Sequence, residues 1–188
     1  MKKIGFIGMG NMGLAILSGV LTNTDKDEII FHCNTKEKMD AISKKYSVMH
    51  KENNSEIVEN AKYIILAIKP QMFNNVINEI KGSIKDESII ISLAPGITIK
   101  QLEEMCGTKR IVRTMPNTPA MAKEGMTGLS LNKEQFSLDE IQEINDIFNS
   151  IGKMKIVDEK LMDAVVCASG SSPAYVFMFI EALADSVV

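Results

Sequence analysis

A glycine-rich turn near the N-terminus has the residue types and spacing to hold a phosphate-containing ligand. Residues 8–13 read GMGNMG, the pattern GxGxxG, and they join a short apolar run to an amphipathic stretch. In such a turn the first glycine permits the bend, the second lets the backbone approach a diphosphate, and the third allows close helix packing. The free N–H groups of the following helix then bind the anion. This placement favours a dinucleotide site over a glycine-rich turn that binds no ligand.

The end of the second apolar run indicates which dinucleotide binds. An NAD site usually has Asp or Glu about 20 residues beyond the glycines, to bind the ribose 2′-hydroxyl. Here the run ends in Asn34, Thr35 and Lys36, and the first carboxylate, Glu37, falls inside the next predicted helix. Hydrogen-bond donors and a positive charge suit a 2′-phosphate, so we expect NADP(H), with NAD(H) as the alternative. Asn34 or Thr35 could also cap that helix, and the two roles are compatible.

Three later loops follow predicted strands, at residues 67–70 (AIKP), 93–96 (LAPG) and 114–119 (TMPNTP). Ligands of doubly wound sheets bind beyond the carboxyl ends of the strands. Lys69 in the first loop could pair with a cofactor phosphate, a ribose or a substrate carboxylate. The alternative for Lys69 is a solvated loop cation.

Short runs rich in Ile and Val alternate with amphipathic stretches and must position these loops. The runs are apolar nearly throughout, which is typical of strands buried on both faces of a parallel sheet. The predicted strands are 3–7, 28–33, 63–67, 88–93 and 110–113, and the predicted helices are 12–21, 36–45, 71–80 and 99–105. Thr98 and Ser137 each begin a capping box, and Gly107 ends a helix. The alternation predicts an α/β fold with a doubly wound, mostly parallel Rossmann sheet.

The pattern changes after about residue 157. Residues 161–168 and 174–188 read as helices with no strand between them, and Pro173 suits the first turn of the second helix. That helix is apolar on most sides and needs neighbours. We therefore expect a dinucleotide-binding domain at 1–158 and the beginning of a helical domain at 159–188. Either the sequence stops partway through this second domain, or a partner subunit covers the apolar helix at 174–188.

Charge, hydropathy and cysteine spacing exclude several functions. The net charge is −3 and no basic cluster is present, which argues against nucleic acid or an acidic membrane as a partner. No uninterrupted apolar run approaches the roughly 20 residues of a membrane helix, and the N-terminus does not resemble a signal peptide. Cys33, Cys106 and Cys167 lack the spacing of a disulfide framework or a zinc site. We expect a cytoplasmic protein without a metal.

Four motifs in succession resemble those of pyrroline-5-carboxylate reductases. They are residues 4–13 (IGFIGMGNMG), 67–71 (AIKPQ), 113–120 (RTMPNTPA) and 170–175 (GSSPAY). The last two are more specific to the family than the glycine turn, and the resemblance extends over the whole chain. Two positions depart from the family: Ser172 stands where Gly is usual, and Pro95 where a small residue is common. The family continues with further helices, so the resemblance implies the nucleotide domain and the start of an all-helical dimerisation domain.

The resemblance implies hydride transfer from NADPH to the C=N bond of 1-pyrroline-5-carboxylate, which completes proline biosynthesis. It also implies a homo-oligomer, either a dimer or a ring of dimers. Because the cofactor carries the hydride, no catalytic side chain is assigned. Alternatives are an NADP-binding fragment without turnover and a related imine or hydroxyacid dehydrogenase. The resemblance and the residues at the strand ends together imply cofactor contacts at Gly8, Met9, Gly10, Asn11, Met12, Asn34, Thr35, Lys36, Asn54, Ala67, Ile68, Lys69, Pro70, Leu93, Ala94, Pro95, Met115 and Asn117. The resemblance also implies substrate contacts at Glu159, Ser171 and Ser172.

Overall fold

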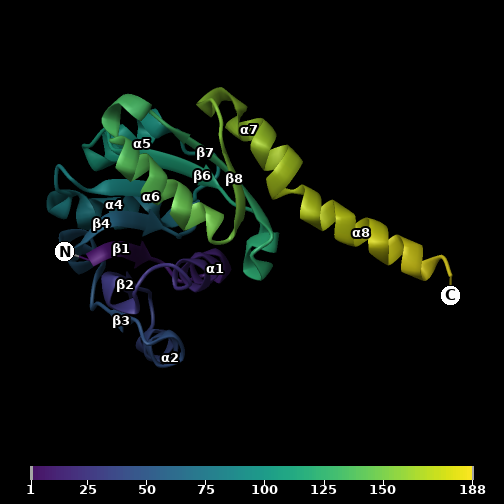
Figure 1. The fold of residues 1–188 in the computed structure, drawn as a ribbon, viewed down its shortest axis with the longest axis horizontal. Coiled ribbons are helices and arrows are strands. Elements are labelled where there is room, and N and C mark those ends of the chain that lie inside the picture. The colour runs from purple at the N-terminus through teal and green to yellow at the C-terminus, as the bar shows by residue number, and fades with distance from the viewer. Residues whose placement is uncertain (1, 188) are drawn as a thin grey trace.

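Eight strands form one sheet in the computed structural model, which describes residues 2–187 (Figure 1). The spatial order is β3-β2-β1-β4-β5-β6-β7-β8, and every neighbouring pair is parallel except β6 and β7. The predicted mostly parallel Rossmann sheet is confirmed. The strands are β1 (Lys2–Ile7), β2 (Ile29–His32), β3 (Met49–His50), β4 (Ala61–Leu66), β5 (Ile89–Ser92), β6 (Ile111–Met115), β7 (Gly125–Leu131) and β8 (Gly152–Ile156).

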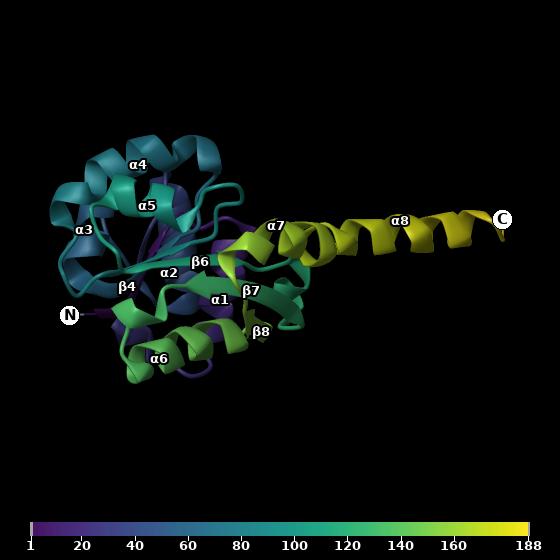
Figure 2. The same ribbon diagram turned by 90° about the horizontal axis from the view of Figure 1, so that it is seen from above.

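Helices cover both faces of this sheet. They are α1 (Asn11–Val20), α2 (Lys36–Tyr46), α3 (Asn54–Asn60), α4 (Phe73–Ile80), α5 (Ile99–Cys106) and α6 (Leu138–Asn149), and two further helices, α7 (Met162–Val165) and α8 (Ser172–Asp185), follow the last strand. Figure 2 shows α3, α4 and α5 together on one face and α6 on the other. Successive strand residues point to opposite faces, so each strand supplies both cores.

The two cores explain why the strands are apolar throughout. Phe6, Phe31 and Tyr63 pack with residues of α1, α2 and α6 on one face. Ile30 and Ile64, each adjacent in sequence to one of these residues, pack with α3, α4 and α5 on the other. A sheet buried on both faces leaves no polar side to its central strands. The doubly wound arrangement therefore follows from the hydrophobic pattern.

Local signals in the sequence fix several helix ends. The Thr98 hydroxyl accepts the Gln101 N–H and begins α5 with a capping box, and Ser137 does the same for α6. Gly107 ends α5 in the left-handed conformation, with φ of 71°. Pro173 lies in the first turn of α8. These predictions are confirmed because they depend on neighbouring backbone groups.

Four elements, β3, α3, β7 and β8, are not among those that the sequence pattern predicts. Strand β3 has two residues and α3 has seven, which is too short for a clear period. Strand β7 contains two glycines, which weaken any strand pattern. Strand β8 has exposed Lys153 and Lys155 alternating with partly buried Met154 and Ile156. This period-two alternation was the signal of a strand covered on one face only.

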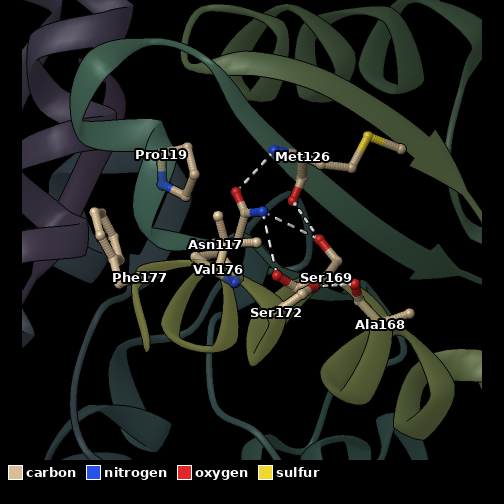
Figure 3. Close-up of a pocket in the computed structure, with 9 residues that line it drawn as sticks. Asn117, Pro119, Met126, Ala168, Ser169, Ser172, Val176 and Phe177 are labelled. Atoms are coloured by element: carbon tan, nitrogen blue, oxygen red, sulfur yellow. Dashed lines mark hydrogen bonds between the residues drawn. The ribbon is translucent and has the colours of Figure 1, made fainter. Parts of the chain in front are cut away.

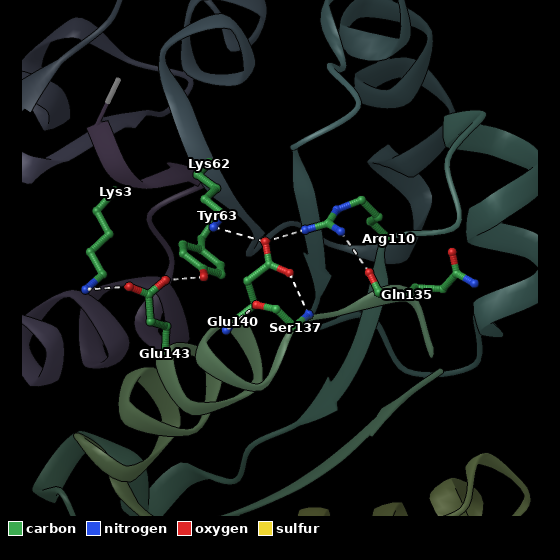
Figure 4. Close-up of polar contacts among 8 residues, drawn as sticks. All are labelled: Lys3, Lys62, Tyr63, Arg110, Gln135, Ser137, Glu140 and Glu143. Atoms are coloured by element: carbon green, nitrogen blue, oxygen red, sulfur yellow. Dashed lines mark hydrogen bonds and ion pairs between the residues drawn. The ribbon is translucent and has the colours of Figure 1, made fainter. Parts of the chain in front are cut away.

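Two half-buried carboxylates, Glu143 and Glu140, bind helix α6 to the sheet (Figure 4). The Glu143 carboxylate accepts a hydrogen bond from the hydroxyl of fully buried Tyr63 and pairs with Lys3 at 3.3 Å. Burial raises the pKa of Tyr63, and the Glu143 carboxylate raises it further. The Tyr63 hydroxyl therefore stays a donor and ties β4 to α6.

Glu140, one turn earlier on α6, binds three partners. Its carboxylate lies 2.6 Å from the Arg110 guanidinium and 3.0 Å from the Lys62 ammonium, and it accepts the Ser137 N–H. Burial acts to raise the pKa of Glu140, but the Ser137 N–H, Lys62 and Arg110 together lower it to about 2. Glu140 is thus ionised and joins α6 to β4 and to the start of β6.

The C-terminal segment is one helical stretch that projects from the sheet domain (Figure 1). Helix α7 continues through a π-helical turn at Val166–Gly170 into α8. Every α8 residue is exposed or half-buried, including Phe177 at 71% and Phe179 at 64%. The predicted apolar helix without neighbours is therefore confirmed within the described chain.

By length and composition, the stretch Glu159–Asp185 could cross a membrane. It has 27 residues and a mean hydropathy of 1.3 over its most apolar 18-residue window. No uninterrupted apolar run has this length; the helix reaches it because the π-helical turn at Val166–Gly170 joins two apolar runs that residues 169–173 separate in the sequence. Length and composition do not distinguish a membrane span from a helix that packs against protein.

Candidate dinucleotide site

The glycine turn has the close contacts that its pattern predicts. Gly8 has φ of +89°, and a Cβ there would lie 2.6 Å from the Ala67 carbonyl oxygen. A Cβ on Gly13 would lie 2.7 Å from the Gly8 carbonyl oxygen. Around Gly10, by contrast, a Cβ would meet no atom within 4 Å. The outer glycines are needed for packing, and Gly10 keeps open the space where a ligand would approach.

Helix α1 presents its N-terminus to that space. Gly10 is the N-cap residue and supplies no capping side chain, and the first turn contains no acidic residue. The Leu14 N–H donates to the Gly10 carbonyl at 2.9 Å. The amides of Asn11, Met12 and Gly13 precede that bond and have no acceptor within the helix. Together with the helix dipole they form a site for a diphosphate.

A cleft of about 270 Å³ opens at this helix start. It brings together eight of the predicted cofactor contacts from four separate loops, and it adds Pro116, which the prediction omitted. The lining residues are Gly10, Asn11, Met12, Ala67, Ile68, Lys69, Leu93, Met115 and Pro116. The loops meet because strands β1, β4, β5 and β6 are adjacent and parallel, so that their carboxyl ends share one edge.

Several predicted contacts lie outside this cleft. The side chain of Met9 is 1% exposed and packs in the core, so only its backbone belongs to the turn. Ala94 is buried, and its N–H donates to the Ser92 hydroxyl. Pro95 is exposed. Pro70 begins a 3-10 turn and lines a neighbouring hollow with Phe73.

The end of β2 carries an exposed polar group of residues. Asn34, Thr35 and Lys36 are all exposed. Thr35 is the N-cap of α2, yet its side chain makes no capping hydrogen bond. The capping alternative is therefore not realised at Thr35, and its hydroxyl stays available to a ligand. His32 before them is half-buried, with Nδ1 2.9 Å from the Lys51 carbonyl oxygen.

Asn54 is not brought to the cleft. Its side-chain amide donates to Glu79 at 2.7 Å, and its backbone N–H donates to the same carboxylate at 3.1 Å. These bonds attach the start of α3 to the last turn of α4. In this conformation the Asn54 amide is engaged within the protein.

A second cleft of about 490 Å³ lies at the N-terminal end of α8 (Figure 3). Its polar centre is Asn117, whose amide donates to the carbonyl and hydroxyl oxygens of Ser169 at 3.2 and 3.3 Å. The side-chain oxygen of Asn117, Oδ1, accepts the Met126 N–H at 2.9 Å. Asn117 thus joins the loop after β6 to β7 and to the π-helical turn. Ser172 lines this cleft and donates to the Ala168 carbonyl, whereas Ser171 does not line it.

Glu159, a predicted substrate contact, lies between two sheet-domain elements. Its Oε1 accepts the Ile99 N–H at 2.7 Å and lies 3.2 Å from the Arg113 guanidinium. Arg113 is 4% exposed and was not singled out from the sequence. An Arg inside an otherwise apolar strand, IVRTM, was the available signal, because a buried cation requires a charged partner.

The described residues 2–187 contain no cluster of three or more His, Cys, Asp or Glu residues that could hold a metal. All three cysteines are free thiols. Burial raises the pKa of Cys33, and it raises that of Cys106 to about 12. Both buried thiols are therefore poor nucleophiles.

A mostly parallel Rossmann sheet with this glycine turn at its first strand is typical of NAD(P)-dependent oxidoreductases. Residues 3–96 match the family model described as NADP oxidoreductase, coenzyme F420-dependent. Residues 159–188 match the model for pyrroline-5-carboxylate reductase dimerisation. Pyrroline-5-carboxylate reductase from Escherichia coli is 38% identical over 190 residues, which span all of this chain and 70% of that protein. The chain belongs to the pyrroline-5-carboxylate reductase family.

Solved structures agree with this assignment. The reductase from Coxiella burnetii superposes with a TM-score of 0.91 at 34% identity, covering 99% of this chain and 70% of that one. The Plasmodium falciparum pyrroline carboxylate reductase, solved with NADP bound, gives a TM-score of 0.86 at 34% identity, covering 98% and 68%. The fold of the family is therefore present over 98–99% of this chain.

Proposed function

We propose that this protein reduces 1-pyrroline-5-carboxylate to L-proline with NADPH. The proposal depends on the open space around Gly10, at the start of α1, where the cofactor diphosphate would bind. The same chain matches pyrroline-5-carboxylate reductase over its full length. A related hydroxyacid or imine dehydrogenase and a nucleotide-binding module without turnover are the less favoured alternatives.

The cofactor would lie along the carboxyl edge of the sheet. The amides of Asn11, Met12 and Gly13 hold its diphosphate, and Gly8 and Gly10 keep that position accessible. Asn34, Thr35 and Lys36 hold the 2′-phosphate of the adenosine ribose, since all three are exposed at the end of β2. An NADP-bound relative supports NADPH over NADH.

The nicotinamide end would occupy the 270 Å³ cleft. The bound nicotinamide supplies the hydride, so the protein has to orient the C=N carbon and exclude water rather than activate a nucleophile. Among the residues that line this cleft, Lys69 alone is titratable. Its ammonium suits the substrate carboxylate or a cofactor phosphate. Glu159 and the segment containing Ser171 and Ser172 would contact the substrate from the C-terminal side.

A second copy of the chain would cover the apolar surface of α8. This segment matches the dimerisation model of the family, and its exposed side chains include Val176, Phe177 and Ile180. Burial against another copy would remove this surface from water. The three free thiols fit a reducing compartment, and we assign the enzyme to the cytoplasm.

The direct test mixes the protein with NADPH and 1-pyrroline-5-carboxylate and follows cofactor oxidation at 340 nm. We expect turnover of about 1 per second or faster, formation of proline, and a lower rate with 1-pyrroline, which lacks the carboxylate. Calorimetry with NADPH alone is run in parallel. Binding without turnover would support the nucleotide-binding module, and no binding would remove the proposal altogether.

A further inference from the structure

The end of β6 and the residues after it border two clefts at once. Met115 and Pro116 line the 270 Å³ cleft at the start of α1, the cofactor cleft. The next residue, Asn117, lines the 490 Å³ cleft at the N-terminal end of α8. Met115 also reaches the π-helical turn, because a Cβ on Gly170 would lie only 3.1 Å from the Met115 Cε. The same short segment therefore contacts the cofactor cleft and the helical stretch that ends in α8.

The π-helical turn lacks a backbone donor where one is needed. The Ser171 N–H donates to the Val166 carbonyl, five residues earlier, which is the bond of a π-turn. If this pattern continued, the Ala168 carbonyl would pair with residue 173. In the α-helical pattern the Ser169 carbonyl would pair with residue 173 instead. Residue 173 is proline and has no N–H, so one of these carbonyls loses its helical donor in either pattern.

Two side chains donate to these carbonyls instead (Figure 3). The Ser172 hydroxyl donates to the Ala168 carbonyl, and the Asn117 amide donates to the Ser169 carbonyl at 3.2 Å. Ser172 is local, whereas Asn117 lies 52 positions earlier, beside the cofactor cleft. The Met126 N–H holds Oδ1 of Asn117, and this bond fixes which end of the amide faces the turn. The conformation of the turn therefore depends on a residue of the sheet domain.

Helix α8 has little else to hold it in the described chain. All of its residues are exposed or half-buried, so the π-helical turn at its start decides where it points. A helix with so few buried contacts opens at a low free-energy cost. Any ligand that holds the turn more firmly will therefore shift α8 toward its ordered state.

We propose that Met115 and Asn117 couple cofactor binding to the ordering of the π-helical turn and α8. A cofactor in its cleft packs against Met115 and keeps the methyl group of that residue on Gly170, while Asn117 holds Ser169. Asn117 is a positioning residue, because it lies outside the cofactor cleft and acts through the turn. Coupling is reciprocal, so a partner that fixes α8 would in turn tighten cofactor binding. This inference rests on the cofactor binding of the proposed function and not on turnover.

Hydrogen exchange with and without saturating NADPH tests the coupling. The protein concentration is one at which sedimentation shows the same species in both samples. In the wild type, NADPH should slow exchange of the amides of residues 166–175 by at least about fivefold. Asn117→Asp keeps the oxygen that binds Met126 but loses the donor to Ser169, so this effect of NADPH should disappear. Ser169→Ala is the matched control, because it keeps the carbonyl that Asn117 binds, and the effect should remain.

Met115→Ala tests the other contact without changing a hydrogen bond. It shortens the side chain away from Gly170, and the effect of NADPH on residues 166–175 should again disappear at saturating cofactor. A merely structural role for Met115 and Asn117 would speed exchange by the same factor with and without NADPH, and that result would overturn the inference. Calorimetry on the same samples separates the two proposals. NADPH binding to the wild type without slower exchange in residues 166–175 would defeat the inference alone, whereas absence of binding would defeat both.

Discussion

Gly8 lies so close to Ala67 that a methyl group on Gly8 would sit 2.6 Å from the Ala67 carbonyl oxygen. The contact joins the turn after β1 to the end of β4, the neighbouring strand. Gly10, two residues later, has φ of −72° and open space around it. The first glycine therefore serves the fold, and the second serves the ligand.

Substitution of the two glycines should separate stability from binding. Gly8→Ala forces a side chain into a positive φ and a backbone contact, so we expect a loss of at least about 2 kcal/mol in the free energy of unfolding. Gly10→Ala should cost under about 1 kcal/mol yet weaken NADPH binding about tenfold or more, because its methyl group occupies the ligand space. Chemical denaturation and calorimetry measure the two quantities. An unchanged NADPH affinity in Gly10→Ala would contradict the proposed diphosphate site at the start of α1.

Lys36 should decide between the two dinucleotides. Lys36→Glu places an anion beside the 2′-phosphate, and we expect NADPH affinity to fall about tenfold while NADH affinity changes little. The same substitution favours the α2 dipole, so stability should not fall with it. Lys44→Glu, in the last turn of α2, is the matched charge control. Calorimetry with both cofactors checks the result, and tighter NADH binding by the wild type would refute NADP preference.

Glu140 should make stability depend on acid pH. Its pKa is lowered to about 2 in the folded protein, from an ordinary value of 4.5. Its contribution is therefore fully present above about pH 4.5 and is lost as the pH falls toward 2. Glu140→Gln should lower the stability at pH 7 by about 1–3 kcal/mol, and its melting temperature should converge with that of the wild type as the pH decreases. Glu134→Gln, at an exposed position, is the control. A difference in melting temperature between Glu140→Gln and the wild type that stays constant with pH would contradict this pH dependence.

The exposed surface of α8 should control assembly. Phe177→Asp places a charge where a second copy would bury an aromatic ring, so the variant should sediment as a smaller species than the wild type. Leu138→Asp is the control, because Leu138 is 85% exposed on α6 and far from this surface in sequence. Analytical ultracentrifugation measures both. Equal sedimentation of Phe177→Asp and wild type would place the interface elsewhere.

The cofactor turn, the alternating fold and the capped helices were all predictable, because their signals are local. The spacing of Gly8 and Gly10 and the hydrogen bond at Thr98 involve residues within one or two turns of each other. Strands that are apolar throughout must pack against other elements on both faces of the sheet. Strand β7 was not predictable in this way, because a glycine-containing segment becomes a strand only when β6 pairs with it.

The sequence by itself determined a dinucleotide-binding Rossmann sheet, followed by an apolar helix in need of a neighbour. Only the tertiary structure decided that Arg113 and Ile99 meet on one oxygen of Glu159, residues separated by 46 and 60 positions along the chain. It also decided that Asn54 binds Glu79 and that Asn117 holds the π-helical turn. Polar side chains can form several alternative hydrogen bonds, and which one forms depends on the elements that packing brings within about 3 Å.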